Sequence, residues 1–156
     1  MGKLSTLRAA VVAELKAHAP LASVSILEEK KLDLANEIEQ AVAKLGLCCV
    51  VLTPVAAVAH PNAPGPVLDP ARVVVAVFEN VLIHRAAADA LSASDAAEEV
   101  LQRLHGWTPP GFSAPLVAAS RGETLELVPD PELLIYHVNL QTTVALPPKS
   151  DPRRIR

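Results

Sequence analysis

The amino-acid sequence predicts an α+β fold, a two-layer sandwich in which a mixed, mainly antiparallel sheet carries helices packed on one face. Three segments repeat apolar residues at helical spacing, and several others alternate or cluster them as strands do. The predicted order is helix, strand, helix, strand, loop, strand, helix and three strands, unlike the regular alternation of parallel α/β folds. The 156 residues, 51% of them hydrophobic, fit one domain, residues 1–147, followed by a basic flexible tail, residues 148–156.

The first third of the chain predicts two amphipathic helices around a short strand. The first helix ends before Pro20, and its apolar stripe is Leu4, Leu7, Val11 and Leu15. The segment "SVSIL" (23–27) alternates polar and apolar residues, which favours a strand. The second helix ends at Gly46, and its apolar face is Leu34, Ile38, Val42 and Leu45.

The segment "LCCVVL" (47–52) is apolar throughout, which is typical of a buried strand. Neighbouring residues of a strand point to opposite faces, so Cys48 and Cys49 are poorly placed to pair with each other. Two adjacent cysteines also lack the spacing of a zinc site. We expect two buried thiols in a reducing compartment.

The next segment, residues 53–71, predicts a long loop, because proline lacks a backbone N–H and blocks regular structure. Its prolines are Pro54, Pro61, Pro64, Pro66 and Pro70. Two interpretations stay open. The apolar composition favours contact with a neighbour, and a disordered excursion is the alternative.

"RVVVAVFENVLIHR" (72–85) is apolar on both faces through its first half, which predicts a central strand interrupted at Glu79 and Asn80. A third helix follows, and we expect Ser94 or Asp95 to cap it, with Glu98 completing a capping box. Gly106 ends this helix, and two following prolines prevent its resumption. Its core-facing residues are Ala97, Val100, Leu101 and Leu104.

Three strands are predicted in the last third, over residues 115–120, 124–128 and 132–146, with a turn at Arg121 and Gly122 between the first two. The final strand has an apolar row: Leu134, Tyr136, Val138, Leu140, Val144 and Leu146. Its opposing polar row is His137, Asn139, Gln141 and Thr143. One sheet face is therefore expected to be packed, and the other to meet water or a partner.

The only tryptophan, Trp107, lies in "LHGWTPPGF" (104–112), directly after the predicted helix end. Gly106 can adopt the left-handed conformation that ends a helix, and a hydrophobic contact back onto the last turn is then favoured. We expect Trp107 to lock the helix exit onto the sheet, so Trp107→Ala should cost on the order of 3 kcal/mol if the site is core. An exposed recognition tryptophan is the alternative.

No catalytic, cofactor-binding or metal-binding residue is predicted, and we expect the protein not to be an enzyme. The six glycines form no phosphate-binding loop, and neither a serine nor a cysteine has an activating motif around it. The histidines lack the spacing that directs two imidazoles at one metal. They are His18, His60, His84, His105 and His137.

Charge and hydropathy limit the possible partners. The formal net charge is −3, of which residues 149–156 contribute +3, so the rest of the chain carries −6. An acidic body disfavours sequence-specific nucleic-acid binding. The apolar runs are shorter than the roughly 18 residues of a membrane helix, and the amino terminus lacks a secretory signal pattern, so we expect a cytoplasmic protein with no membrane partner.

The segment "LHGWTPPG", preceded by a helix and by a long strand with "FENVLIHR", resembles small tail proteins of tailed phages and prophages. The resemblance is to the tail terminator or minor tail protein type, including the Mu-like group, and covers residues 1–147. It implies an α/β sandwich that forms rings, typically hexamers, and caps the tail tube without enzymatic activity or cofactor. The implied partners are further copies, the tail tube protein and head–tail connector proteins, and the implied location is the host bacterial cytoplasm during assembly and then the virion tail.

This sequence departs from that type in its apolar segment 54–71 and its basic extension. Two other functions therefore stay open. One is a small α+β binding or regulatory module of a bacterial cytoplasm, and the other is an enzyme whose site forms only in the fold.

Overall fold

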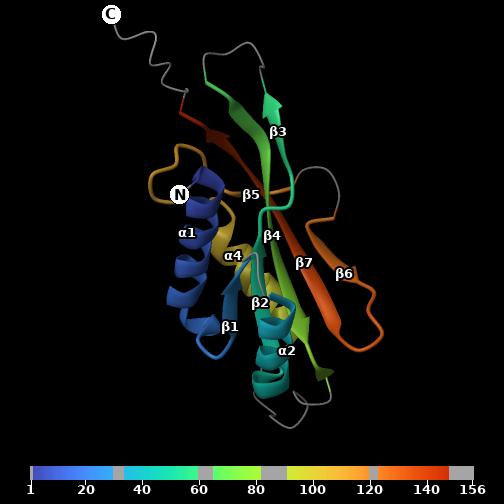
Figure 1. Ribbon diagram of the computed structural model, residues 1–156. Coiled ribbons are helices and arrows are strands. Elements are labelled where there is room, and N and C mark those ends of the chain that lie inside the picture. Colours follow the sequence, from blue (N-terminus) through green and yellow to red (C-terminus); the bar gives the residue numbers. More distant parts are fainter. Residues whose placement is uncertain (1, 30–33, 60–64, 82–90, 120–122, 148–156) are drawn as a thin grey trace, which may run out of the picture.

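The computed structural model describes residues 2–29, 34–59, 65–81, 91–119 and 123–147. In this part of the chain three α-helices pack on an open, mixed, seven-stranded sheet, so the α+β fold expected from the sequence is confirmed (Figure 1). The helices are α1 Lys3–Ala17, α2 Leu34–Leu45 and α4 Ala93–Leu104, with a 3-10 turn, η1, at Ala19–Leu21. The strands are β1 Ser25–Glu28, β2 Leu47–Leu52, β3 Ala56–Ala59, β4 Val67–Glu79, β5 Val117–Ala118, β6 Leu125–Val128 and β7 Leu134–Ala145.

The sheet is built around two long antiparallel strands, β4 and β7. Its order is β1-β2-β4-β7-β5, with β3 also paired to β4 and β6 also paired to β7. The pair β1–β2 is parallel and the other described pairs are antiparallel. The second half of β4 pairs with β2, and its first half pairs with β3. Consequently β4 connects the body of the sheet with the β3–β4 hairpin at the other end (Figure 1).

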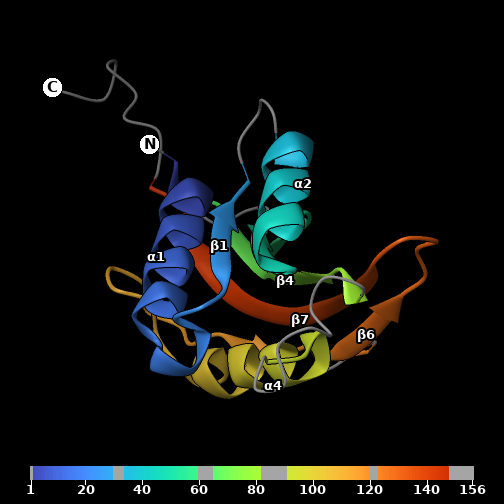
Figure 2. The same cartoon turned by 90° about the horizontal axis from the view of Figure 1, so that it is seen from below.

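The helices cover the sheet unequally. Helices α1 and α4 lie on one face, as expected, and pack there with Cys49, Val75 and Val138 in one buried cluster. Helix α2 lies instead on the opposite face, where Ile38 and Val42 contact a second cluster (Figure 2). The reason is that β2 is apolar on both sides, so each of its faces takes a helix.

The polar–apolar alternation of β7 is confirmed. Val138, Leu140 and Val144 are at most 1% exposed and belong to the cluster under α1 and α4. The intervening His137, Asn139, Gln141 and Thr143 are half-buried on the other face. The polar row therefore lies on the sheet face that α1 and α4 leave uncovered.

The long loop expected at 53–71 is wrong in part, because residues 56–59 and 67–71 form strands. The sequence was misleading because two of its prolines, Pro66 and Pro70, occupy positions where a β-sheet tolerates the missing backbone N–H. Pro66 precedes β4, and Pro70, which follows a cis peptide bond, lies where the pairing of β4 shifts register. Residues 60–64, with Pro61 and Pro64, lie outside the described residues.

The ends of the helices follow the expected chemistry with one correction. Ser92, not Ser94 or Asp95, caps α4, because the helix begins at Ala93, and the Ser92 hydroxyl accepts a hydrogen bond from the Asp95 N–H at 3.2 Å. The Ala93 N–H donates to the buried carboxylate of Glu79 at 2.9 Å, which ties the start of α4 to the end of β4.

The exits from α2 and α4 are closed by glycines in the left-handed region, Gly46 at φ 75° and Gly106 at φ 82°. After Gly106, the Trp107 N–H donates to the Leu104 carbonyl, and the Trp107 carbonyl accepts from Leu116 at 2.9 Å. The ring of Trp107 is half-buried and packs against the larger cluster. The helix exit is thereby fixed beside the sheet, as the sequence predicts.

Candidate functional site

Most chemically active side chains in the described residues have structural partners. The His18 imidazole lies 2.9 Å from the Glu99 carboxylate, and the Arg103 guanidinium lies 2.6 Å from Glu14, so these two contacts join α1 and the residue that follows it to α4. The Nδ1 atom of His105 accepts the Ala118 N–H at 3.0 Å. His60, His84, Arg121 and Gly122 lie outside the described residues. Within the described ranges, no group of three or more histidine, cysteine or acidic residues could hold a metal ion.

The two cysteines are separated by the plane of the sheet. Both are 0% exposed, with Cys49 in the cluster under α1 and α4 and Cys48 in the cluster under α2. Burial raises the pKa of Cys48 from 9.0 to about 12. Burial, and to a lesser degree the neighbouring Cys48, also raises the pKa of Cys49. Both side chains are therefore thiols rather than nucleophilic thiolates at neutral pH.

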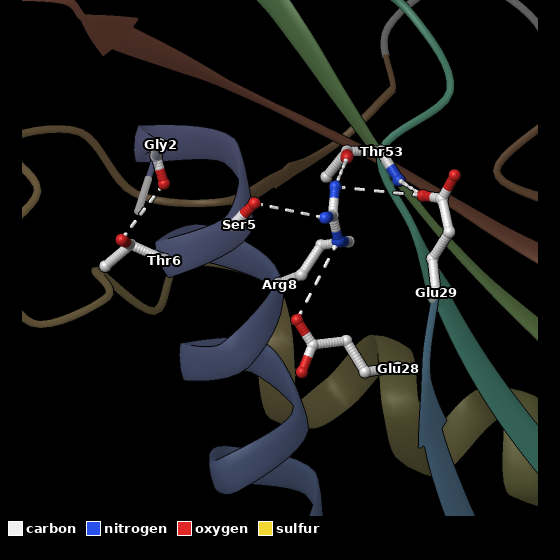
Figure 3. A network of polar contacts seen from close by, with 7 residues as sticks. All are labelled: Gly2, Ser5, Thr6, Arg8, Glu28, Glu29 and Thr53. Carbon is white, nitrogen blue, oxygen red and sulfur yellow. Dashed lines mark hydrogen bonds and ion pairs between the residues drawn. The ribbon is translucent and has the colours of Figure 1, made fainter. Parts of the chain in front are cut away.

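A polar network around Arg8 ties α1 to the ends of β1 and β2 (Figure 3). Its guanidinium donates to the Thr53 hydroxyl at 2.6 Å and to the Ser5 hydroxyl at 3.2 Å. Glu28 and Glu29 lie 3.9 and 3.8 Å from the same group. The Thr53 N–H donates to Glu29, so the chain leaving β2 is also held.

This network could not be predicted from the sequence. Arg8 contacts Thr53 across 45 positions of the chain, and no local spacing signals such a contact. One cation beside two carboxylates positions a helix on a sheet.

An apolar cleft of about 530 Å³ lies between α2 and the start of β7. Ile38, Val42 and Leu133 contribute apolar surface, and the acidic residues Glu39 and Glu132 also line the cleft. Two acidic groups disfavour phosphate and other anions in this cleft.

No helix in the described part of the chain is long and apolar enough to cross a membrane.

The most exposed strands lie on opposite edges of the sheet. We call residues Val55–Ala59, which contain β3, the β3 edge, and residues Leu125–Val128, which form β6, the β6 edge. Among the described residues, three large apolar side chains are more than half exposed, and all three belong to these edges: Val55 at 57%, Val58 at 54% and Leu127 at 53%. Among the described strands, β3 pairs only with β4, and β6 pairs only with β7.

Each edge therefore presents one unpaired side of backbone N–H and C=O groups together with apolar side chains. Between the two edges lies the half-exposed polar row of β7. These features make an association surface the best candidate for a functional site. The sequence analysis did not predict a strand at the β3 edge, because the many prolines of residues 53–71 indicated a loop.

Comparison with known proteins does not add to this geometry. No protein-family model matches the sequence, and no curated protein is significantly similar to it.

Proposed function

We propose that the protein is a structural subunit of a phage or prophage tail, of the tail terminator or tail completion type, which assembles with further copies into a ring. The observation that carries this proposal is the pair of exposed strand edges on opposite sides of one sheet. A subunit with two different adhesive edges associates head to tail, and head-to-tail contacts close into rings when the rotation between subunits allows it.

The resemblance of "LHGWTPPG" and its preceding elements to tail proteins supplies the biological context for such a ring. In this proposal the ring is hexameric and caps the tail tube, with the tail tube protein and head–tail connector proteins as partners. It assembles in the host bacterial cytoplasm and remains in the virion tail. The protein has no catalytic activity in this role.

Charge is compatible with a channel for DNA. The chain without residues 149–156 carries a formal charge of −6, and an acidic lumen lets a phosphate backbone pass without binding. Lysine and arginine side chains lining the lumen of an imaged ring would contradict this part of the proposal.

The test is assembly on a tail tube. Purified protein, alone and with the cognate tail tube protein, is measured by light scattering over a range of concentrations and imaged by electron microscopy. We expect rings at tube ends, and tails of uncontrolled length when the gene is deleted. A protein that stays monomeric with the tube protein present, and whose deletion leaves tails unchanged, would refute the proposal and favour a small binding module.

A further inference from the structure

We propose that the β3 edge of one copy pairs with the β6 edge of the next copy, so that the sheet continues from subunit to subunit. This inference rests on the proposed function only for the closed ring; the contact between two copies stands on the geometry alone. Strand addition to an exposed sheet edge is a common mode of association, in which backbone hydrogen bonds provide affinity.

The two edges match in length and accessibility. Strands β3 and β6 each have four residues. Three of the four residues of β3 are exposed, and so are the two central residues of β6. The remaining edge strands, β1 and β5, contain only buried and half-buried residues. The β3 edge also lacks the charged side chains with which exposed edges are normally protected.

The direction and register of the contact follow from the sheet. Because β3 is antiparallel to β4, β4 to β7, and β7 to β6, strands β3 and β6 run in opposite directions. Val58 pairs with Leu68 and Leu127 pairs with Tyr136, and both partners face α1 and α4. An antiparallel register that sets Val58 opposite Leu127 therefore covers both exposed side chains on the same face.

Charge disfavours the pairing of two β6 edges with each other. In the register that sets Val58 opposite Leu127, the exposed Glu126 of β6 falls opposite Ala59 of β3, so no like charges meet in the contact. Two β6 edges would instead bring the exposed Glu126 side chains of both copies close together. Like charges across a contact oppose association, so β6 is expected to pair with the uncharged β3 edge of the next copy and not with another β6 edge.

The experiment cross-links single-cysteine variants with a short bismaleimide. Val58→Cys and Leu127→Cys each add one accessible thiol, because Cys48 and Cys49 are 0% exposed. We expect a covalent dimer when the two variants are mixed and none when either is treated alone. The matched control replaces Leu127→Cys with Gln102→Cys, which is exposed on α4 and should give no cross-link with Val58→Cys.

A second pair of variants measures the strength of association. Val58→Asp places a charge in the contact and should weaken self-association at least about tenfold by light scattering, whereas Gln102→Asp should leave it unchanged. Three results overturn the inference: Val58→Cys cross-linking to itself, no cross-link in the mixture at the highest soluble concentration, or equal association of the two aspartate variants.

The two proposals fail separately. Rings that form on tails without the Val58–Leu127 cross-link would refute strand pairing and leave the tail function intact. A cross-link in solution, together with normal tails after deletion of the gene, would refute the tail function and leave strand pairing intact.

Discussion

Replacing Trp107 with alanine should destabilise the protein by about 2 kcal/mol. Truncation of a fully buried tryptophan costs roughly 3 to 5 kcal/mol, and the Trp107 ring is half-buried against the larger cluster, so about half of that range applies. The sequence-based value of about 3 kcal/mol assumed a core position. The backbone bonds that join Gly106 and Trp107 to Leu116 do not involve the ring and should persist in the variant.

The assay is urea unfolding followed by far-ultraviolet circular dichroism, because the variant has no tryptophan fluorescence. With a denaturant slope of about 2 kcal/mol per molar urea, a loss of about 2 kcal/mol lowers the unfolding midpoint by about 1 M. Trp107→Phe keeps an aromatic ring on the cluster and should lose less than about 1 kcal/mol. A change below about 0.5 kcal/mol in Trp107→Ala would refute the anchoring role and favour a tryptophan that serves recognition.

Three further predictions concern α4 and the buried thiols. Ser92→Ala removes the cap of α4 and should cost about 1 kcal/mol in urea unfolding, whereas Ser94→Ala should change little; the reverse order would contradict the observed cap. Both thiols should resist an aromatic disulfide reagent at pH 8 until urea unfolds the chain, and rapid labelling of the folded protein would contradict their burial. Burial raises the pKa of the Cys48 thiol from 9.0 to about 12. The contribution of this thiol to the free energy of unfolding is therefore fully present below pH 9, where the thiol is protonated in both the folded and the unfolded chain. The free energy of unfolding should therefore fall between pH 9 and about 12, as the unfolded thiol ionises and the folded one does not. In the Cys48→Val variant, the free energy of unfolding should fall less between pH 9 and about 12, because this thiol is absent.

The sequence predicted those elements whose signal is local. The alternation of β7, the apolar stripe of α1 and the glycine exits at Gly46 and Gly106 depend on neighbouring positions, and the structure has all of them. The side chain of Leu45 and the basic extension at 148–156 lie outside the described residues.

Features that depend on distant contacts could not be predicted. A helical stripe shows which side of α2 is buried but not which face of the sheet buries it. Ser94 satisfies the capping pattern as well as Ser92 does, and Ala93 begins the helix because its N–H reaches Glu79. The β3 edge escaped notice because its strand forms only through β4, across prolines that local rules assign to a loop.

Cys48 and Cys49, adjacent in sequence, contribute to two packing environments on opposite faces of the sheet. A bulkier residue at 48 would press on the cluster under α2, and one at 49 on the cluster under α1 and α4. The two helical layers can thus accumulate substitutions independently of each other. In related chains, compensating changes should occur within a layer and seldom between layers.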